Sequence, residues 1–131
     1  MLGHRHRVLV VDDDRGLREA LETVFRLEGY GVATAGEGQQ ALDRLRNGLD
    51  PCVILLDIMM PVKDGWEFRR EQVKDPNLAR IPVILCSSLE DTDDRARALG
   101  LNHRLRKPIG YDELLALVAH YCAQERPRPC P

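Results

Sequence analysis

Residues 52–57 read Cys-Val-Ile-Leu-Leu-Asp, an apolar run that ends on a carboxylate. Three further strand-like runs lead to polar or charged residues in the same way: 8–11 to Asp12, Asp13 and Asp14, 82–86 to Ser87, and 103–106 to Lys107. Short runs bounded by turn residues and rich in Val, Ile and Leu are typical of buried parallel strands. The carboxyl ends of such strands share one edge of an open α/β sheet, where ligands bind. We therefore expect carboxylates, a hydroxyl and an ammonium group to converge at that edge.

Between these runs the apolar residues recur at helical spacing, which predicts amphipathic helices. Helices are expected over about 15–28, 40–47, 65–73, 91–99 and 113–122, and a further strand over 30–35. Asp112 is the expected N-cap of the last helix. Five βα units in series, joined by right-handed crossovers, require a doubly wound parallel sheet with helices on both faces. The sequence therefore predicts a single α/β domain.

The amino-acid composition limits the kinds of partner that the chain can bind. The chain has 131 residues, and its 19 Lys and Arg against 21 Asp and Glu give a formal charge of -2. Without a global positive field, the chain by itself is not expected to bind nucleic acid. No apolar stretch approaches the ~20 residues that span a bilayer, and no signal-type apolar segment follows the basic start. We expect a cytoplasmic protein with no membrane contact.

The four cysteines are scattered and form no Cys-x-x-Cys pair. We expect reduced thiols, with Cys52 and Cys86 acting as small buried hydrophobic residues. Residues 125–131 are rich in proline, which indicates a tail or the start of a linker. The expected organisation is one domain over 1–124 followed by that segment.

Four motifs of this chain together resemble the receiver domain of two-component response regulators. They stand in order along the chain: Val10-Val11-Asp12-Asp13-Asp14, Leu55-Leu56-Asp57-Ile58-Met59-Met60-Pro61 with Asp64-Gly65, Cys86-Ser87-Ser88, and Lys107-Pro108. The resemblance extends from about Arg7 to Cys122. It implies the flavodoxin-like fold, with five parallel strands in the order 2-1-3-4-5 and five helices.

The resemblance also implies a role for each residue at the predicted edge. Asp57 would be the phosphoacceptor, Lys107 and Ser87 would contact the phosphoryl oxygens, and Mg²⁺ would be held by Asp12, Asp13, Asp57 and the backbone carbonyl of Met59. The chemistry agrees, because transfer from a phosphohistidine needs an oxygen nucleophile and counter-charge more than a general base. Mg²⁺ prefers oxygen ligands and often bridges carboxylates to phosphate.

Simpler interpretations exist for each residue taken alone. Asp14 fits a helix N-cap better than a metal ligand, and Asp12 or Asp13 alone could also be a cap. Ser87 alone would be a strand-end hydroxyl, and Lys107 alone a surface lysine. Only if these residues lie close together in the fold do they favour a phosphorylation and metal site. The Lys107-Pro108 bond is predicted to be cis, as the resemblance also implies, so that the lysine can point inward.

Two positions depart from the family pattern. Arg104 stands three residues before the lysine, where the family usually has an aromatic residue that changes rotamer on activation. Lys63 stands where an apolar residue is usual. Burying an unpaired guanidinium is costly, so Arg104 is expected to stay at the surface, paired with a carboxylate from 90–94 and contacting the output partner.

The resemblance implies a switch that is not an enzyme in the ordinary sense, although it assists its own phosphorylation and dephosphorylation. The implied donor is a sensor histidine kinase or a histidine phosphotransfer protein, and the implied output surface comprises the fourth helix, the last strand and the fifth helix. The chain could also be the receiver part of a longer hybrid kinase or output-domain regulator. A Mg²⁺-dependent phosphatase of the haloacid dehalogenase type would need an aspartate two residues after the nucleophile, where Met59 stands.

Overall fold

A computed structural model describes residues 6–88 and 93–123 of the chain. Within them, strands and helices alternate five times. In chain order they are β1 (Arg7–Val11), α1 (Arg15–Leu27), β2 (Gly31–Ala35), α2 (Gly38–Arg46), β3 (Val53–Leu56), α3 (Gly65–Lys74), β4 (Val83–Ser87), α4 (Asp93–Ala98), β5 (His103–Arg106) and α5 (Tyr111–Ala123). None of the helices described is long and apolar enough to span a bilayer.

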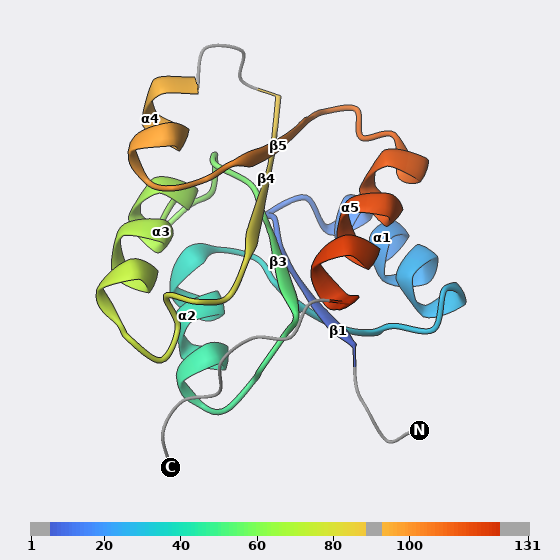
Figure 1. Cartoon of the computed structure of the whole chain (residues 1–131), viewed down its shortest axis with the longest axis horizontal. Helices are drawn as coiled ribbons and strands as arrows, with labels where there is room; N and C mark the ends of the chain where they lie inside the picture. The colour runs from blue at the N-terminus through green and yellow to red at the C-terminus, as the bar shows by residue number, and fades with distance from the viewer. Residues whose placement is uncertain (1–5, 89–92, 124–131) are drawn as a thin grey trace.

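The five strands form one parallel sheet in the order β2-β1-β3-β4-β5, which confirms the predicted topology. Helices α1 and α5 cover one face, and α2, α3 and α4 cover the other (Figure 1). Because helices cover both faces, the central strands are buried on both sides, and β3 is buried along its whole length. This explains why β3 is a continuous apolar run without polar alternation.

Two hydrophobic clusters, one on each side of the sheet, hold the layers together. Leu55 of β3 packs with Phe25, Leu114 and Val118 on the α1 and α5 side. On the other side the neighbouring β3 residues pack against α2, α3 and α4, with Leu42, Phe68 and Ala96 in the cluster. The successive side chains of one strand thus serve both clusters, and the strand ends are held in register.

The helix boundaries differ slightly from those expected. Helix α2 begins at Gly38, where the Glu37 side chain accepts a hydrogen bond from Gln39 N. Helix α5 begins at Tyr111, so Asp112 lies in the first turn and is not the N-cap. There its negative charge still interacts favourably with the positive, N-terminal end of the helix dipole. The predicted start of α4 at 91–92 lies outside the described residues.

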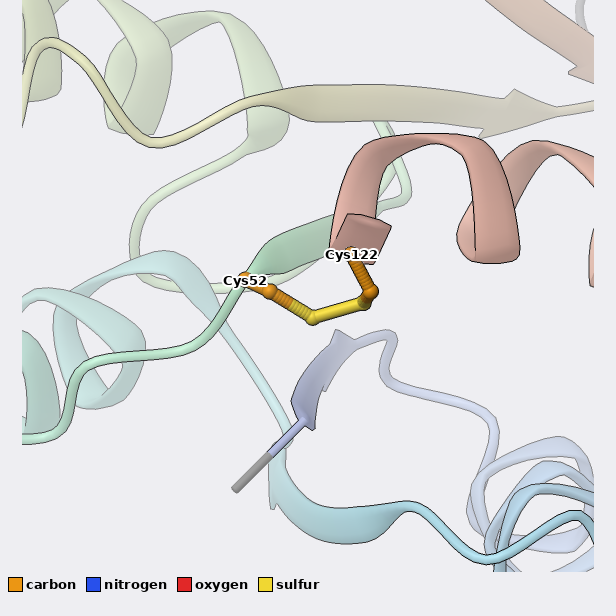
Figure 2. Close-up of a disulfide and its surroundings, with 2 residues drawn as sticks. All are labelled: Cys52 and Cys122. Atoms are coloured by element: carbon orange, nitrogen blue, oxygen red, sulfur yellow. A yellow bond between two sulfur atoms is a disulfide. The ribbon is translucent and has the colours of Figure 1, made fainter. Parts of the chain in front are cut away.

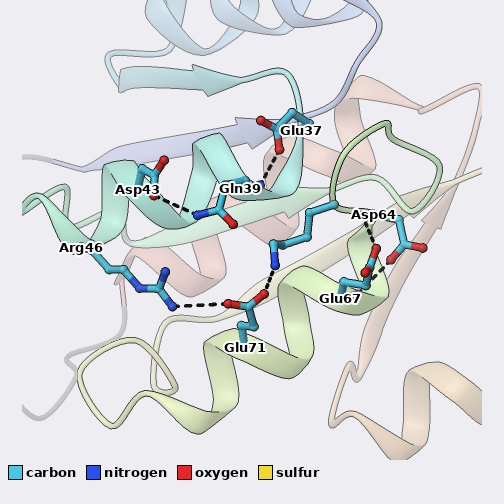
Figure 3. A network of polar contacts seen from close by, with 8 residues as sticks. Glu37, Gln39, Asp43, Arg46, Asp64, Glu67 and Glu71 are labelled. Carbon is cyan, nitrogen blue, oxygen red and sulfur yellow. Dashed lines mark hydrogen bonds and ion pairs between the residues drawn. The ribbon is translucent and has the colours of Figure 1, made fainter.

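The loop after β3 is fastened to helix α3. Asp64 caps the helix in a capping box with Glu67, and Glu71 one turn later accepts contacts from Lys63 and from Arg46 of α2 (Figure 3). Lys63, which departs from the family pattern, therefore ties the loop to α3. Since this loop begins directly after Asp57, these contacts support the loop beside the strand edge.

A second set of contacts joins α3 to the segment around α4. The buried Arg69 donates from Nε to the carbonyl oxygen of Leu99 at 2.9 Å and from a guanidinium nitrogen to Gln72 Oε1 at 2.8 Å. Arg95 lies over the Trp66 ring, 4.6 Å from its centroid. Burial lowers the pKa of Arg69, and its hydrogen bonds keep the charged group satisfied.

The expectation of reduced thiols was wrong for two cysteines. Cys52 and Cys122 form a disulfide with their Cα atoms 5.1 Å apart, between the start of β3 and the last turn of α5 (Figure 2). The two residues are 70 positions apart, so no local sequence motif indicates that they pair. Cys86 is a free, buried thiol, as predicted, and Cys130 lies outside the described residues.

Candidate functional site

The predicted residues meet at the carboxyl edge of the sheet. Asp12 follows β1, Asp57 follows β3, Ser87 ends β4, and Lys107 follows β5. Hydrogen bonds continue the ladder one step beyond the strands: Asp57 N donates to Val11 O at 2.9 Å, and Lys107 N donates to Ser87 O at 3.0 Å. The backbone of the sheet therefore sets the positions of these side chains.

Lys107 joins the two buried carboxylates. Its Nζ lies 2.6 Å from Asp12 Oδ2 and 3.4 Å from Asp57 Oδ1, while the two aspartate side chains are only 4% and 8% exposed. Buried carboxylates need such a partner, because an unpaired buried charge is strongly destabilising. One ammonium group thus compensates two carboxylates incompletely and leaves the cluster with excess negative charge.

The third carboxylate of the cluster is Asp13. One oxygen atom from each of Asp12, Asp13 and Asp57 lies within 4.8 Å of the others, and Asp13 is exposed to solvent. Asp14 has the simpler role predicted for it, because it caps α1 by accepting a hydrogen bond from Leu17 N. Three carboxylates, open to water on one side, are a donor set that suits a hard divalent cation such as Mg²⁺.

The pKa values in the site reflect this crowding. Burial and the charge of Asp12 raise the pKa of Asp57, and Lys107 opposes the rise only in part. Burial alone would lower the pKa of Lys107, but its hydrogen bond and charge interaction with Asp12 raise it. Lys107 is therefore a permanent cation near neutral pH, and Asp57 holds its proton more strongly than an exposed aspartate.

The remaining predicted residues lie around this centre. Ser87 is buried at the end of β4, and Met59 is 62% exposed in the loop that follows Asp57. The Lys107-Pro108 peptide bond is cis, as predicted. Arg18 was not foreseen: its guanidinium donates to the carbonyl oxygen of Asp12 at 2.7 Å. It lies on the polar face of α1, and nothing in the local pattern distinguishes it from the other arginines there.

Gly65 belongs to one of the motifs quoted from the sequence, but the sequence did not indicate what it does at the site. Its nitrogen donates to Ile58 O at 2.8 Å, and a Cβ at this position would lie 2.3 Å from the carbonyl oxygen of Asp57. Real Cβ atoms do not approach backbone so closely. The start of α3 can therefore pack against the Asp57 backbone only because residue 65 has no side chain.

We expect Gly65→Ala to destabilise the domain by about 1–3 kcal/mol, because the β3–α3 loop must move to admit the methyl group. Gly110→Ala is the matched control, since a Cβ there meets no atom within 4 Å. Urea unfolding of both variants measures the difference in the free energy of unfolding. Equal stability of the two variants would show that the close approach at Gly65 is not required.

Comparison with known proteins agrees with this geometry. The family model of the response regulator receiver domain matches residues 8–119. The chain therefore belongs to the receiver-domain family of two-component response regulators. The fold and the motif order implied by the sequence are thus those of its family.

Individual relatives show the same likeness. The DNA-binding response regulator MtrA of Mycobacterium leprae is 38% identical over 116 residues, which are 87% of this chain and 50% of MtrA. The receiver domain of a signal transduction histidine kinase from Syntrophus aciditrophicus has a TM-score of 0.84 and 27% identity, covering 96% of this chain and 97% of that domain. The response regulator TrrA from Thermotoga maritima, solved with Mg²⁺ and BeF, has a TM-score of 0.78 and 29% identity, covering 88% and 98%. The chain spans about half the length of the curated relatives it matches.

Proposed function

We propose that this receiver domain accepts a phosphoryl group on Asp57 from a sensor histidine kinase or a histidine phosphotransfer protein. The observation that carries the proposal is the pairing of one lysine with two buried carboxylates, Asp12 and Asp57, at the carboxyl edge of the sheet. In the reaction a carboxylate oxygen of Asp57 attacks phosphorus, the P–N bond to the donor histidine breaks, and an acyl phosphate forms.

The neighbouring residues would stabilise the negative charge on the phosphoryl oxygens during the transfer. Lys107 lies 3.4 Å from Asp57 and can supply positive charge to a phosphoryl oxygen. Ser87 ends the adjacent strand, from which its hydroxyl can donate to another oxygen. Phosphoryl transfer depends mainly on such positioning and charge stabilisation. No dedicated general base is needed, because Asp57 reacts as the carboxylate.

We further propose that Asp12, Asp13, Asp57 and the backbone carbonyl of Met59 hold Mg²⁺. The three carboxylates have ligand atoms within 4.8 Å of one another, and their excess negative charge would repel an incoming phosphate. Bound Mg²⁺ would supply the missing positive charge and orient the phosphoryl oxygens. Asp13, which is exposed, would be the residue that meets the cation from solvent.

The proposed output surface comprises α4, β5 and α5. Arg104 of β5 is exposed, as predicted, and pairs in register with Leu85 of β4. A buried aromatic rotamer switch is therefore not available at this position. The predicted ion pair with residues 90–94 falls largely outside the described residues. We propose that Arg104 contacts the partner directly through its charge.

If Arg104 contacts the output partner and takes no part in phosphoryl transfer, Arg104→Ala should leave phosphorylation of Asp57 unchanged. The initial rate of phosphoryl uptake is expected to stay within about twofold of the parent, and Tm within roughly 2 °C, because exposed ion pairs contribute little stability. Arg106→Ala, at another exposed position of β5, is the matched control. A tenfold loss of rate in Arg104→Ala alone would mean that Arg104 acts at the phosphorylation site.

We propose the same domain limits as the sequence suggests, 1–124 with a proline-rich segment after it, and a cytoplasmic location where kinase domains could reach it. The chain matches about half the length of its curated relatives, and both a separate receiver and the receiver part of a longer regulator or hybrid kinase remain compatible with the proposed function. The domain itself is not expected to bind nucleic acid or a membrane. Membership in the receiver family argues against the phosphatase alternative, as does Met59 in place of the second aspartate.

Phosphotransfer from purified, autophosphorylated histidine kinases of the source genome tests the proposal. We expect rapid Mg²⁺-dependent labelling by one kinase, no labelling of Asp57→Asn, and slowed labelling of Lys107→Ala. Circular dichroism of each variant checks that it is folded. Labelling of folded Asp57→Asn at the parent rate would contradict the proposal.

A further inference from the structure

A second group of reactive side chains lies at the opposite edge of the sheet from Asp57. Cys52 directly precedes β3, and Cys122 lies in the last turn of α5 (Figure 2). A ring nitrogen of His6 and the two sulfur atoms lie within 4.8 Å of one another. Cys52 is further fixed by a hydrogen bond from its nitrogen to Arg7 O at 2.8 Å. Three chain segments thus bring a disulfide and an imidazole together.

The two cysteines of the disulfide differ in burial. Cys52 and the neighbouring His6 are half-buried, whereas Cys122 is only 6% exposed. Cys86 offers a contrast within the same molecule. It is 3% exposed, and burial raises its pKa to about 12, so it stays an unreactive thiol.

We propose that Cys52, Cys122 and His6 form a reversible thiol–disulfide exchange site whose substrate is a low-molecular-weight thiol. A first thiolate attacks the sulfur of Cys52, the less buried of the two residues, which breaks the S–S bond, forms a mixed disulfide and releases Cys122 as a thiolate. A second thiolate attacks the small-molecule sulfur of that mixed disulfide and releases Cys52. Two small thiols are oxidised to one disulfide, and the protein gains two electrons and two protons.

His6 has a defined part in this exchange. An imidazole close to both sulfur atoms can donate a proton to the departing thiolate, and its cationic form stabilises the thiolate by charge. The His6 ring also packs edge-on to Tyr30, with the centroids 6.4 Å apart, and the backbone of residue 6 accepts a hydrogen bond from Gly31 N at 2.9 Å. These contacts hold the imidazole beside the disulfide.

The bond also has a structural consequence for α5. It fastens the last turn of α5 to the residue directly before β3, and the side chains of Cys122 and Val53 belong to one hydrophobic cluster. His103 of β5 contacts Tyr121, the residue before Cys122, so the fastening reaches the edge strand as well. Oxidation would therefore restrain the α5–β5 surface, whereas reduction would leave it held by packing alone.

The experiment uses the full chain equilibrated with mixtures of reduced and oxidised glutathione, which are then quenched with acid. The quenched protein is unfolded in denaturant, so that the buried Cys86 is accessible, and alkylated with a maleimide before mass spectrometry. All four cysteines should be alkylated in the most reducing mixture and two in the most oxidising one. Digestion should then yield the Cys52–Cys122 cross-linked peptide, and the conversion should reverse when the mixture is changed. Because the disulfide joins residues 70 positions apart, its formation should raise Tm by roughly 15 °C.

Matched variants separate this site from the other thiols. Cys52→Ser and Cys122→Ser should each abolish the conversion and match the reduced parent in Tm, whereas Cys86→Ala and Cys130→Ser should retain it. His6→Gln should slow exchange several-fold; an unchanged rate would remove His6 from the site. Four alkylated cysteines in every mixture, or protection that disappears in Cys130→Ser, would overturn the proposal. None of these readouts depends on phosphorylation.

Discussion

Asp57→Asn is expected to have two opposite effects, loss of phosphoryl uptake and a gain in stability of the metal-free domain. Labelling by a phosphorylated kinase should fall to background, because the amide is not a nucleophile for phosphoryl transfer. At neutral pH the variant should unfold at higher denaturant concentration than the parent. It removes one of two buried carboxylates that share a single lysine.

The pH dependence of the free energy of unfolding would identify the cause of this gain in stability. The folded-state pKa of Asp57 is raised, first by burial and then by Asp12, so the folded protein holds this proton more strongly than the unfolded chain does. The stabilisation from that proton is complete below the ordinary carboxyl pKa and is lost as pH rises through the raised value. The parent without metal should therefore lose stability over this range, and Asp57→Asn should lose less. Parallel curves for the two proteins would contradict the proposed origin of the shift.

Mg²⁺ is expected to reverse this loss of stability. At ten times its dissociation constant, one ion that binds only the folded state contributes about 1.4 kcal/mol, which corresponds to a Tm rise of roughly 5 °C for a domain of this size. Asp13→Asn should abolish the gain while leaving the fold intact, because Asp13 is exposed. Asp14→Asn is the matched control, since Asp14 caps α1 and asparagine caps equally well.

Binding can be followed directly through Trp66, the only tryptophan of the chain. It is buried beside Gly65, which packs against the Asp57 backbone, so its fluorescence should change as Mg²⁺ is added. The parent and Asp14→Asn should titrate alike, and Asp13→Asn should titrate weakly or not at all. A Tm and a fluorescence signal indifferent to Mg²⁺ in the parent would rule out the proposed metal site.

Much of the fold could be predicted because its signals are local and repeated. The apolar runs that form β1, β3 and β4 are typical of strands buried on both faces, and each run ends at or directly before a residue that the site uses. The order of the strands came from the family resemblance. No sequence pattern fixes which strands of a doubly wound sheet are neighbours, and the structure confirms that order.

The features that were missed depend on packing that exists only in the folded chain. The Cys52–Cys122 disulfide joins two positions that become neighbours only when α5 packs beside β3. Arg18 looks like any polar residue of an amphipathic helix until the chain brings it to the Asp12 carbonyl. Gly65 was marked only as part of a motif. Its role comes from the lack of space for a side chain beside Asp57, which the sequence does not reveal. Packing in the folded chain produces each of these features, whereas the strand-end residues were marked by sequence alone.

The most direct test of the account is to locate the phosphoryl group. The protein would be phosphorylated by its donor in the presence of Mg²⁺, and borohydride would then reduce the acyl phosphate so that the modified aspartate becomes homoserine. Peptide mass spectrometry should find homoserine at position 57 alone. Homoserine at position 12 or 13, or a phosphate on Ser87 that survives the reduction, would contradict the assignment of Asp57 as the phosphoacceptor.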